Sequence, residues 1–389
     1  MSGTGNVHDK LFDGGAPLRL VRSLGLVKPD QPLVARRALL AVLIGWLPPA
    51  VLAAGYLLIS ADESAKTFFP DYGFHARFLV AVPALIFAEA DCIPRLGKIA
   101  GQFADTGLIA GTDTARFHAA VSSTGKLLNS IIDEVVTIVL AYLVVLILAV
   151  YISPDLLASW QSPDGLRLSP AGWWHALVSL PLLLVLLFGW LWRLALWARF
   201  LFLVSRLDLQ LIAGHPDRVG GLRFVSTSLL GFRLISVALG AIVAGAVANG
   251  EMHRGKQPID FRNLVIGLLV FLLLLFAGPL TVFLKKLRET KIRGVFEYGA
   301  LAAAVGTEFE GKWLRQKSVD GTSLEVPDFS ATTDLYSVAA NVYAMREVPF
   351  TLKDLIGPIV ISALFPLLPA ALLAIPIKVI IQALAKLLF

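Results

Sequence analysis

The stretch VVTIVLAYLVVLILAVYI, residues 135–152, decides the fold, because it contains no charged side chain over its whole length. A helix rises about 1.5 Å per residue, so roughly 20 apolar residues cross the hydrocarbon core of a bilayer. The chain as a whole is also apolar: 57% of its 389 residues are hydrophobic, 16% are charged, and the mean hydropathy is +0.75. Soluble domains carry roughly 25% charged residues. We therefore predict an integral membrane protein, whose first partner is the lipid bilayer.

Seven stretches of the chain are apolar and long enough to form membrane-spanning helices. They cover about 38–60, 76–96, 131–152, 176–204, 228–249, 263–284 and 355–376. This pattern predicts an all-α fold, a polytopic membrane helical bundle of about seven transmembrane helices with a cytoplasmic helical hairpin.

The same pattern divides the chain into four parts. These are a cytoplasmic N-terminal tail (1–37), a bundle of six spans (38–284) with a cytoplasmic helical extension (99–130), a cytoplasmic helical hairpin (285–354), and a seventh span with an amphipathic C-terminal helix (355–389). Within the extension, we expect a helix over 113–130, capped by Asp113, that runs into the third span without a break.

The distribution of Lys and Arg predicts the orientation. Six basic residues precede the first span and ten lie within 285–354, whereas the loop 153–175 holds only Arg167. Cytoplasmic loops of membrane proteins carry the excess of Lys and Arg. The N-terminus, the segments 97–130 and 205–227 and the hairpin are therefore expected on the cytoplasmic side.

The hairpin prediction rests on a helical period in the segment after the sixth span. Apolar residues recur three or four positions apart, as on one face of an amphipathic helix. They are Val295, Tyr298, Leu301, Val305, Phe309 and Trp313. A loop with Gly321 and Pro327 follows, and a second helix is expected around 331–346.

Motifs of soluble enzymes are missing from the sequence. It has no P-loop, dinucleotide-binding glycine pattern, nucleophile elbow or zinc-binding His-Glu-x-x-His helix. The six histidines lack the spacing of metal ligands, and the single cysteine, Cys92, allows no disulfide within the chain. We therefore name no catalytic residue, metal site or cofactor; enzymatic activity is left open, and a lipid-modifying enzyme would have to use His215 with Asp217. The basic residues follow membrane edges, so no nucleic-acid partner is expected.

The polar loop LDLQLIAGHPDRVGGLRFVS, residues 207–226, joins the fourth and fifth spans and has three interpretations. It can be a helix junction, in which Pro216 and two glycines break the helices and an aspartate caps the next one. It can be an anion site, in which two arginines hold a ligand at the start of the fifth span. It can also be a docking surface for 285–354. The residues concerned are His215, Asp217, Arg218, Gly220, Gly221 and Arg223.

Three segments resemble, in this order, an uncharacterised group of bacterial multi-pass inner-membrane proteins. They are HPDRVGGLRF (215–224), EYGALAAAVGTEFEGKW (297–313) and MREVPFTLKDLIGPIVISALFPLLPAALL (345–373). The resemblance covers roughly 205–375. It implies a multi-pass topology and a bacterial inner membrane, and it carries no activity.

Charged residues inside the spans are costly and mark either structural pairs or functional sites. Asp91 and Arg95 are four residues apart and can pair on one helix. We predict that Glu89 lies beside Arg193, Arg233 or both, in the cytoplasmic half of the bundle. Such a cluster is either a structural brace or a carboxylate that carries protons or coordinates a cation.

Small residues recur at every fourth position of the fifth span, which lets another helix approach closely. They are Ser236, Gly240, Ala244 and Ala248. A homo-oligomer through this face is one expectation. For the function, the sequence favours a channel or transporter for a small ion or solute, and the alternative is a non-catalytic membrane sensor or assembly factor that acts through its cytoplasmic helices.

Overall fold

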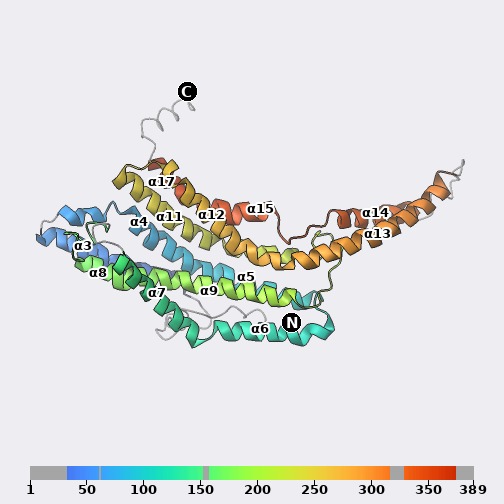
Figure 1. The fold of residues 1–389 in the computed structure, drawn as a ribbon, viewed down its shortest axis with the longest axis horizontal. Helices are drawn as coiled ribbons and strands as arrows, with labels where there is room; N and C mark the ends of the chain where they lie inside the picture. The colour runs from blue at the N-terminus through green and yellow to red at the C-terminus, as the bar shows by residue number, and fades with distance from the viewer. Residues whose placement is uncertain (1–32, 61–62, 152–156, 316–327, 374–389) are drawn as a thin grey trace, which may run out of the picture.

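The computed structural model describes residues 33–60, 63–151, 157–315 and 328–373. Within these ranges every regular element is a helix, and a single antiparallel bridge joins Ile109 to Leu209 (Figure 1). The predicted all-α fold is thereby confirmed. The N-terminal tail up to residue 32 and the expected amphipathic helix over 378–389 lie outside the described residues.

Five helical stretches in the described ranges are long and apolar enough to cross a membrane. They are Val34–Leu58, Ile131–Tyr151, Pro170–Ser205, Arg233–Arg254 and Pro258–Trp313. The expected spans 76–96 and 355–376 are not among them; the first lies on helical residues 72–105, and the second falls partly on helical residues 352–364 and 367–373. Several apolar helices suit an integral membrane protein, and the count of seven spans stays a prediction.

The helices follow one another along the chain with short connections. Those of the first half are α2 (Val34–Gly45), α3 (Leu47–Ser60), α4 (Tyr72–His75), α5 (Val82–Asp105), α6 (Thr114–Leu128), α7 (Ile131–Tyr151), α8 (Pro170–Trp174) and α9 (Leu180–Ser205). Those of the second half are α10 (Ser228–Gly231), α11 (Arg233–Arg254), α12 (Arg262–Ala277), α13 (Leu284–Trp313), α14 (Asp328–Tyr343), α15 (Leu352–Leu355), α16 (Ser362–Leu364) and α17 (Leu367–Leu373).

Prolines locally widen three of these helices into π-helical turns. A proline lacks the amide proton of a helical bond and clashes with the carbonyl four residues earlier, and a wider turn accommodates both effects. The turns are Ala76–Ala81 before Pro83, His175–Ser179 before Pro181, and Ile356–Ile361 around Pro358.

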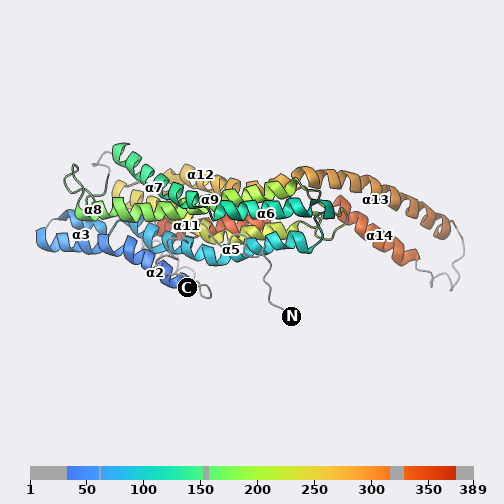
Figure 2. The same cartoon turned by 90° about the horizontal axis from the view of Figure 1, so that it is seen from below.

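The segment expected to run unbroken into the third span is in fact two helices. α6 ends at Leu128 and α7 begins at Ile131, because the Asn129 side chain bonds back to the Gly125 carbonyl and Ser130 caps the new helix through the Ile132 amide. α6 then lies along α9 (Figure 2). The Asp113 carboxylate caps no amide of α6; it accepts the Asp208 amide at 2.6 Å instead, which ties the start of α6 to the loop after α9.

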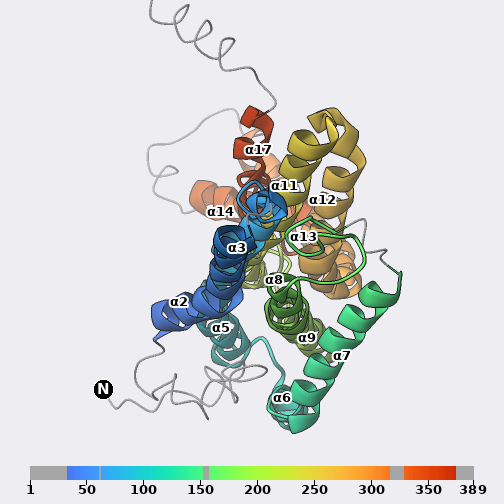
Figure 3. The same ribbon diagram turned by 90° about the vertical axis from the view of Figure 1, so that its left-hand side faces the viewer.

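The small-residue face of α11 is filled by the chain itself. Ser236 is fully buried, and a methyl group built on Gly240 would lie 2.1 Å from the Ala363 carbonyl oxygen of α16. α17 packs beside α16 on the same helix (Figure 3). A helix does approach this face closely, but it belongs to the same chain. The face is therefore covered, which contradicts the expected homo-oligomer contact through it.

The long helical stretch Pro258–Trp313 crosses the bundle and continues beyond it. Its 56 residues extend about 84 Å at 1.5 Å per residue, far more than a hydrocarbon core of about 30 Å. α14 returns along α13, so the two helices form a hairpin that projects past the rest of the molecule (Figure 1). Gly299 and Gly306 of α13 make room for the hydroxyl groups of Tyr343 and Tyr336.

The contact between α11 and α16 gives a stability prediction. In Gly240→Ala, the new methyl group would collide with the backbone of α16, and overpacking of this kind costs about 1–3 kcal/mol. Melting of the purified protein in detergent should therefore occur at a lower temperature. Gly267→Ala in α12 is the matched control, since open space surrounds Gly267, and it should leave the melting temperature unchanged or raise it slightly. Equal effects of the two substitutions would contradict the close packing.

Candidate functional site

A buried carboxylate ties three helices together in the middle of the bundle. Glu89 of α5 accepts from Arg37 of α2 (Nη2 to Oε2, 2.7 Å) and from Arg193 of α9 (Nη1 to Oε1, 3.2 Å). All three side chains are at most 6% exposed. The Arg193 guanidinium also lies 5.2 Å from the ring centre of Trp190, a cation–π contact. Both oxygens of Glu89 therefore face a guanidinium in a setting with little access to water.

The structure brings only one of the two expected arginines to Glu89. Arg193 is its partner, whereas the Nε of Arg233 lies 3.2 Å from Oδ2 of Asp91 and its side chain is half exposed. Asp91 also accepts from Arg95 at 3.3 Å, as the four-residue spacing indicated. Helical phase explains the difference: residues two positions apart point about 200° apart around a helix, so Glu89 and Asp91 face different neighbours.

Arg37 is the residue that sequence analysis missed, because it was counted among the basic residues that orient the N-terminus. A usable signal was present. Arg37 shares one helix face with Ala41 and Gly45, at every fourth position, and all three are buried. An arginine that continues a stripe of small residues points into the bundle rather than to the lipid surface.

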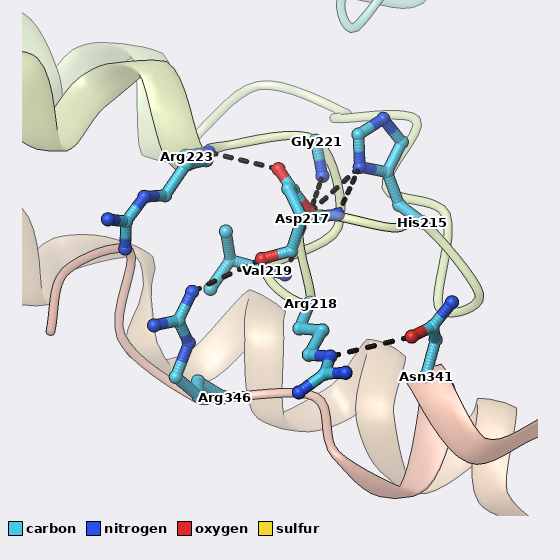
Figure 4. A network of polar contacts seen from close by, with 8 residues as sticks. All are labelled: His215, Asp217, Arg218, Val219, Gly221, Arg223, Asn341 and Arg346. Carbon is cyan, nitrogen blue, oxygen red and sulfur yellow. Dashed lines mark hydrogen bonds and ion pairs between the residues drawn. The ribbon is translucent and has the colours of Figure 1, made fainter.

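The loop after α9 is organised around the carboxylate of Asp217 (Figure 4). Its Oδ1 accepts the amides of Val219 (2.8 Å) and Gly221 (3.2 Å), and its Oδ2 accepts the amide of Arg223 (3.1 Å). His215 Nδ1 lies 2.8 Å from Oδ1. The loop can close around one side chain because Gly221 adopts φ 96°, a conformation open mainly to glycine.

This arrangement bears directly on the anion-site hypothesis. Backbone amides that converge in a loop form a nest for an anion. Here the nest already contains one, the carboxylate of Asp217 itself. Burial alone would raise the pKa of Asp217, but the three amides and His215 outweigh that effect and lower it, so the group is a stable internal anion. An external ligand would have to displace it.

The arginines of the loop bind the C-terminal part of the chain instead (Figure 4). Arg346, just after α14, donates its amide to the Arg218 carbonyl (2.8 Å) and its Nη2 to the Asp217 carbonyl (3.1 Å). Arg218 has φ 58°, which a residue with a side chain seldom adopts, and its Nε is 3.4 Å from Oδ1 of Asn341. These bonds hold the base of the hairpin on the loop.

A second ion pair, between Arg223 and Asp354, attaches the same loop to the start of α15. Arg223 Nη2 lies 2.9 Å from Oδ1 of Asp354. The other oxygen of Asp354 accepts the amide and the hydroxyl of Thr351, a capping box at the start of α15. Of the three interpretations of the loop, the geometry supports a helix junction that also serves as a docking surface for the segment 341–354.

A third polar cluster lies at the opposite end of the bundle and was not predicted. Asp71 is 4% exposed and accepts from the amide of Phe74 (2.9 Å), Asn249 Nδ2 (2.8 Å) and the indole of Trp160 (2.9 Å). Burial raises the pKa of Asp71, but these bonds outweigh it and the net shift is downward. Trp160 and His175 are buried in this cluster, whereas Trp173 and Trp174 nearby in the sequence are exposed. Partners so far apart in sequence leave no local signal.

No protein-family model, curated protein or solved structure matches the chain. The interpretation of its sites therefore rests on their own geometry.

The buried triad predicts a large effect of neutralising Glu89. Glu89→Gln would leave two buried guanidinium groups without a counter-charge, and breaking a buried pair costs about 3–5 kcal/mol. We expect a marked loss of thermal stability in detergent, partly restored in Glu89→Gln with Arg37→Gln. Arg233→Gln is the control, because its half-exposed pair with Asp91 contributes little. A Glu89→Gln protein as stable as the wild type would contradict the brace.

The Asp217 nest predicts a pH-dependent contribution to stability. Because the pKa of Asp217 is lowered on folding, its contribution is complete above the ordinary value of about 3.9 and disappears as the pH falls through the lower, folded value. Hydrogen bonds to a charged group contribute about 1.5–3 kcal/mol. Asp217→Asn should therefore melt below the wild type at pH 7, and the difference should shrink as the pH falls below the ordinary value of about 3.9. Asp334→Asn, at an exposed position of α14, should match the wild type throughout.

Proposed function

We propose that the protein is a membrane-anchored docking platform, which presents the α13–α14 hairpin to a protein partner on the cytoplasmic side of a bacterial inner membrane. This is the non-catalytic assembly or sensor role that the sequence offered as its alternative. The observation that carries the proposal is the hairpin itself, which stands clear of the bundle (Figure 1) and has exposed aromatic side chains among its residues.

The exposed aromatic residues of α14 lie on one face. Phe329, Tyr336 and Tyr343 are spaced seven residues apart, two helical turns. Each packs partly on α13, through Phe309 and Trp313 or through Gly306 and Gly299, and each is still at least 46% exposed. On α13, Phe296 is 73% exposed. Aromatic side chains are enriched in protein interfaces because they bury a large area at a small cost in conformational entropy. A solvent-exposed surface with four such side chains supports the binding of a protein partner.

The charge of the hairpin supports both its position and the chemistry of its partner. Its root carries Lys285, Lys286, Arg288, Lys291 and Arg293, which suit the headgroup region of the cytoplasmic leaflet. Beyond the root, the described residues of the hairpin carry Glu297, Glu308, Glu310, Asp328 and Asp334 against Lys312 and Arg315. Anionic lipids repel such an acidic tip, so it stands away from the membrane. The complementary partner is a basic amphipathic helix that lays its apolar face on the aromatic residues.

The fixed base of the hairpin also suits a platform. The Arg346 and Arg223 contacts anchor the return of α14 and the start of α15 on the loop after α9. A docking surface held in one orientation loses less freedom when a partner binds, which favours affinity.

The channel or transporter prediction receives less support from the buried charges. A carboxylate that carries a cation through a membrane has to exchange it, whereas both oxygens of Glu89 are held by arginines in a buried setting. That geometry suits a structural brace. Flux of ions through liposomes containing the purified protein remains the measurement that would favour transport.

The docking proposal predicts a specific cross-link and a charge-dependent affinity. A photoreactive phenylalanine analogue at position 296 or 336 should give, in cells, one adduct with the same partner protein. After purification of that partner, Glu308→Lys with Asp334→Lys should lower its affinity at least tenfold, because both changes place like charges against its basic helix.

The control carries the same charge change at the other end of the bundle. Asp164→Lys with Asp260→Lys alters two exposed carboxylates, one in the segment before α8 and one just before α12, and should leave the affinity unchanged. Adducts at neither position, or an equal loss of affinity in the control, would rule out docking at the hairpin.

A further inference from the structure

A large cleft opens at the end of the bundle opposite the hairpin. Its volume is about 740 Å³, within the range of roughly 300–1,000 Å³ that small-molecule sites occupy. It lies between α7, the segment around α8, the start of α9 and the end of α11. In Figure 3, α7 lies along the side of α9, away from α11.

One wall of the cleft carries positive charge. Arg77 and Arg254 come from different helical segments, and both also line a second cavity of about 300 Å³, so their side chains lie between the two cavities. The carboxylate on this wall, Asp71, already accepts three hydrogen bonds from protein groups. The arginines therefore outnumber the carboxylate, and that carboxylate is engaged elsewhere.

A buried histidine on the same wall has a ring nitrogen without a hydrogen-bond partner among the described residues. His175 is 6% exposed and lines the cleft, and its Nδ1 has no hydrogen-bond partner among the described residues. Buried polar atoms are normally paired, and an unpaired one calls for a missing partner. The Nδ1 atom itself is inaccessible to solvent, so a ligand in the cleft would reach it only after the His175 side chain turns.

The opposite wall is apolar and continues to the lipid-facing surface. Val145 and Leu148 of α7 and Leu180 of α9 line the cleft, while Leu146 and Val150 of α7 are exposed on the surface next to it. A ligand that fits both walls has an anionic head and an apolar tail. A free anion would leave the apolar wall uncovered.

We propose that this cleft binds an anionic phospholipid, an amphiphile whose headgroup carries a net negative charge, with its phosphate at Arg77 and Arg254 and its acyl chain along α7. Arginine binds phosphate oxygens through its planar array of N–H donors. The site is separate from the hairpin, so it stands whether or not the hairpin docks a partner.

Native mass spectrometry of the full-length protein in a neutral detergent tests this site, with phosphatidylglycerol and phosphatidylcholine as probes. Phosphatidylglycerol should be retained at least tenfold more tightly, and Arg254→Gln should remove that preference. Arg262→Gln is the matched control, since it removes an exposed arginine at the same end that does not line the cleft. Equal retention of the two lipids, or an equal loss in Arg262→Gln, would overturn the proposal.

Two further measurements are needed. One distinguishes loss of lipid binding from misfolding, and the other distinguishes binding of a lipid from binding of free phosphate. Arg254→Gln should melt at the wild-type temperature without added lipid; if it does not, Ala176→Trp, which fills the apolar side, should reduce retention at unchanged stability. Inorganic phosphate at the lipid concentration should not displace phosphatidylglycerol. Displacement by inorganic phosphate, or lipid retention that neither variant changes, would contradict the binding of an amphiphile in this cleft.

Discussion

The ion triad of Arg37, Glu89 and Arg193 is the constraint on which the rest of the bundle depends. Each side chain comes from a different helix, so the position of α2, α5 and α9 relative to one another is fixed by charge as well as by packing. Charges in a membrane are tolerated when they are paired, and here one carboxylate serves two guanidinium groups while Trp190 covers one of them. Helices that shifted by one turn would break both pairs, so the triad sets their register.

The loop after α9, outside the spans, also depends on one carboxylate that pairs with several donors. Amides left unpaired at a helix junction need acceptors, and Asp217 supplies one carboxylate to three of them. With those amides satisfied from within, the carbonyl groups of Asp217 and Arg218 remain to accept from Arg346. The junction and the attachment of the hairpin are thus one structure, in which the internal anion shapes the surface that the C-terminal segment binds.

The sequence allowed the all-α class and the pairing of Glu89 with Arg193 to be predicted, because hydropathy and span direction are local signals. It could not separate Arg37 from the basic residues that orient the chain, since an arginine at a helix start serves either purpose. Of the two arginines offered for Glu89, Arg193 alone meets it, and Arg233 pairs with Asp91, because helical phase turns the two carboxylates toward different neighbours. The contacts of Asp217 with Arg346 were out of reach because they join residues 129 positions apart, and no single-sequence pattern reports such a distance.

The segment after the hairpin links these parts physically. Its beginning, at Arg346 and Asp354, clamps the loop after α9, and its continuation at Ala363 fills the small-residue face of α11. Without Gly240 on α11, the backbone of α16 could not come within contact distance, and the segment could not both cross α11 and reach the loop. The ribbon of small residues is therefore explained without a second copy of the chain: it admits the same segment that holds the hairpin in place.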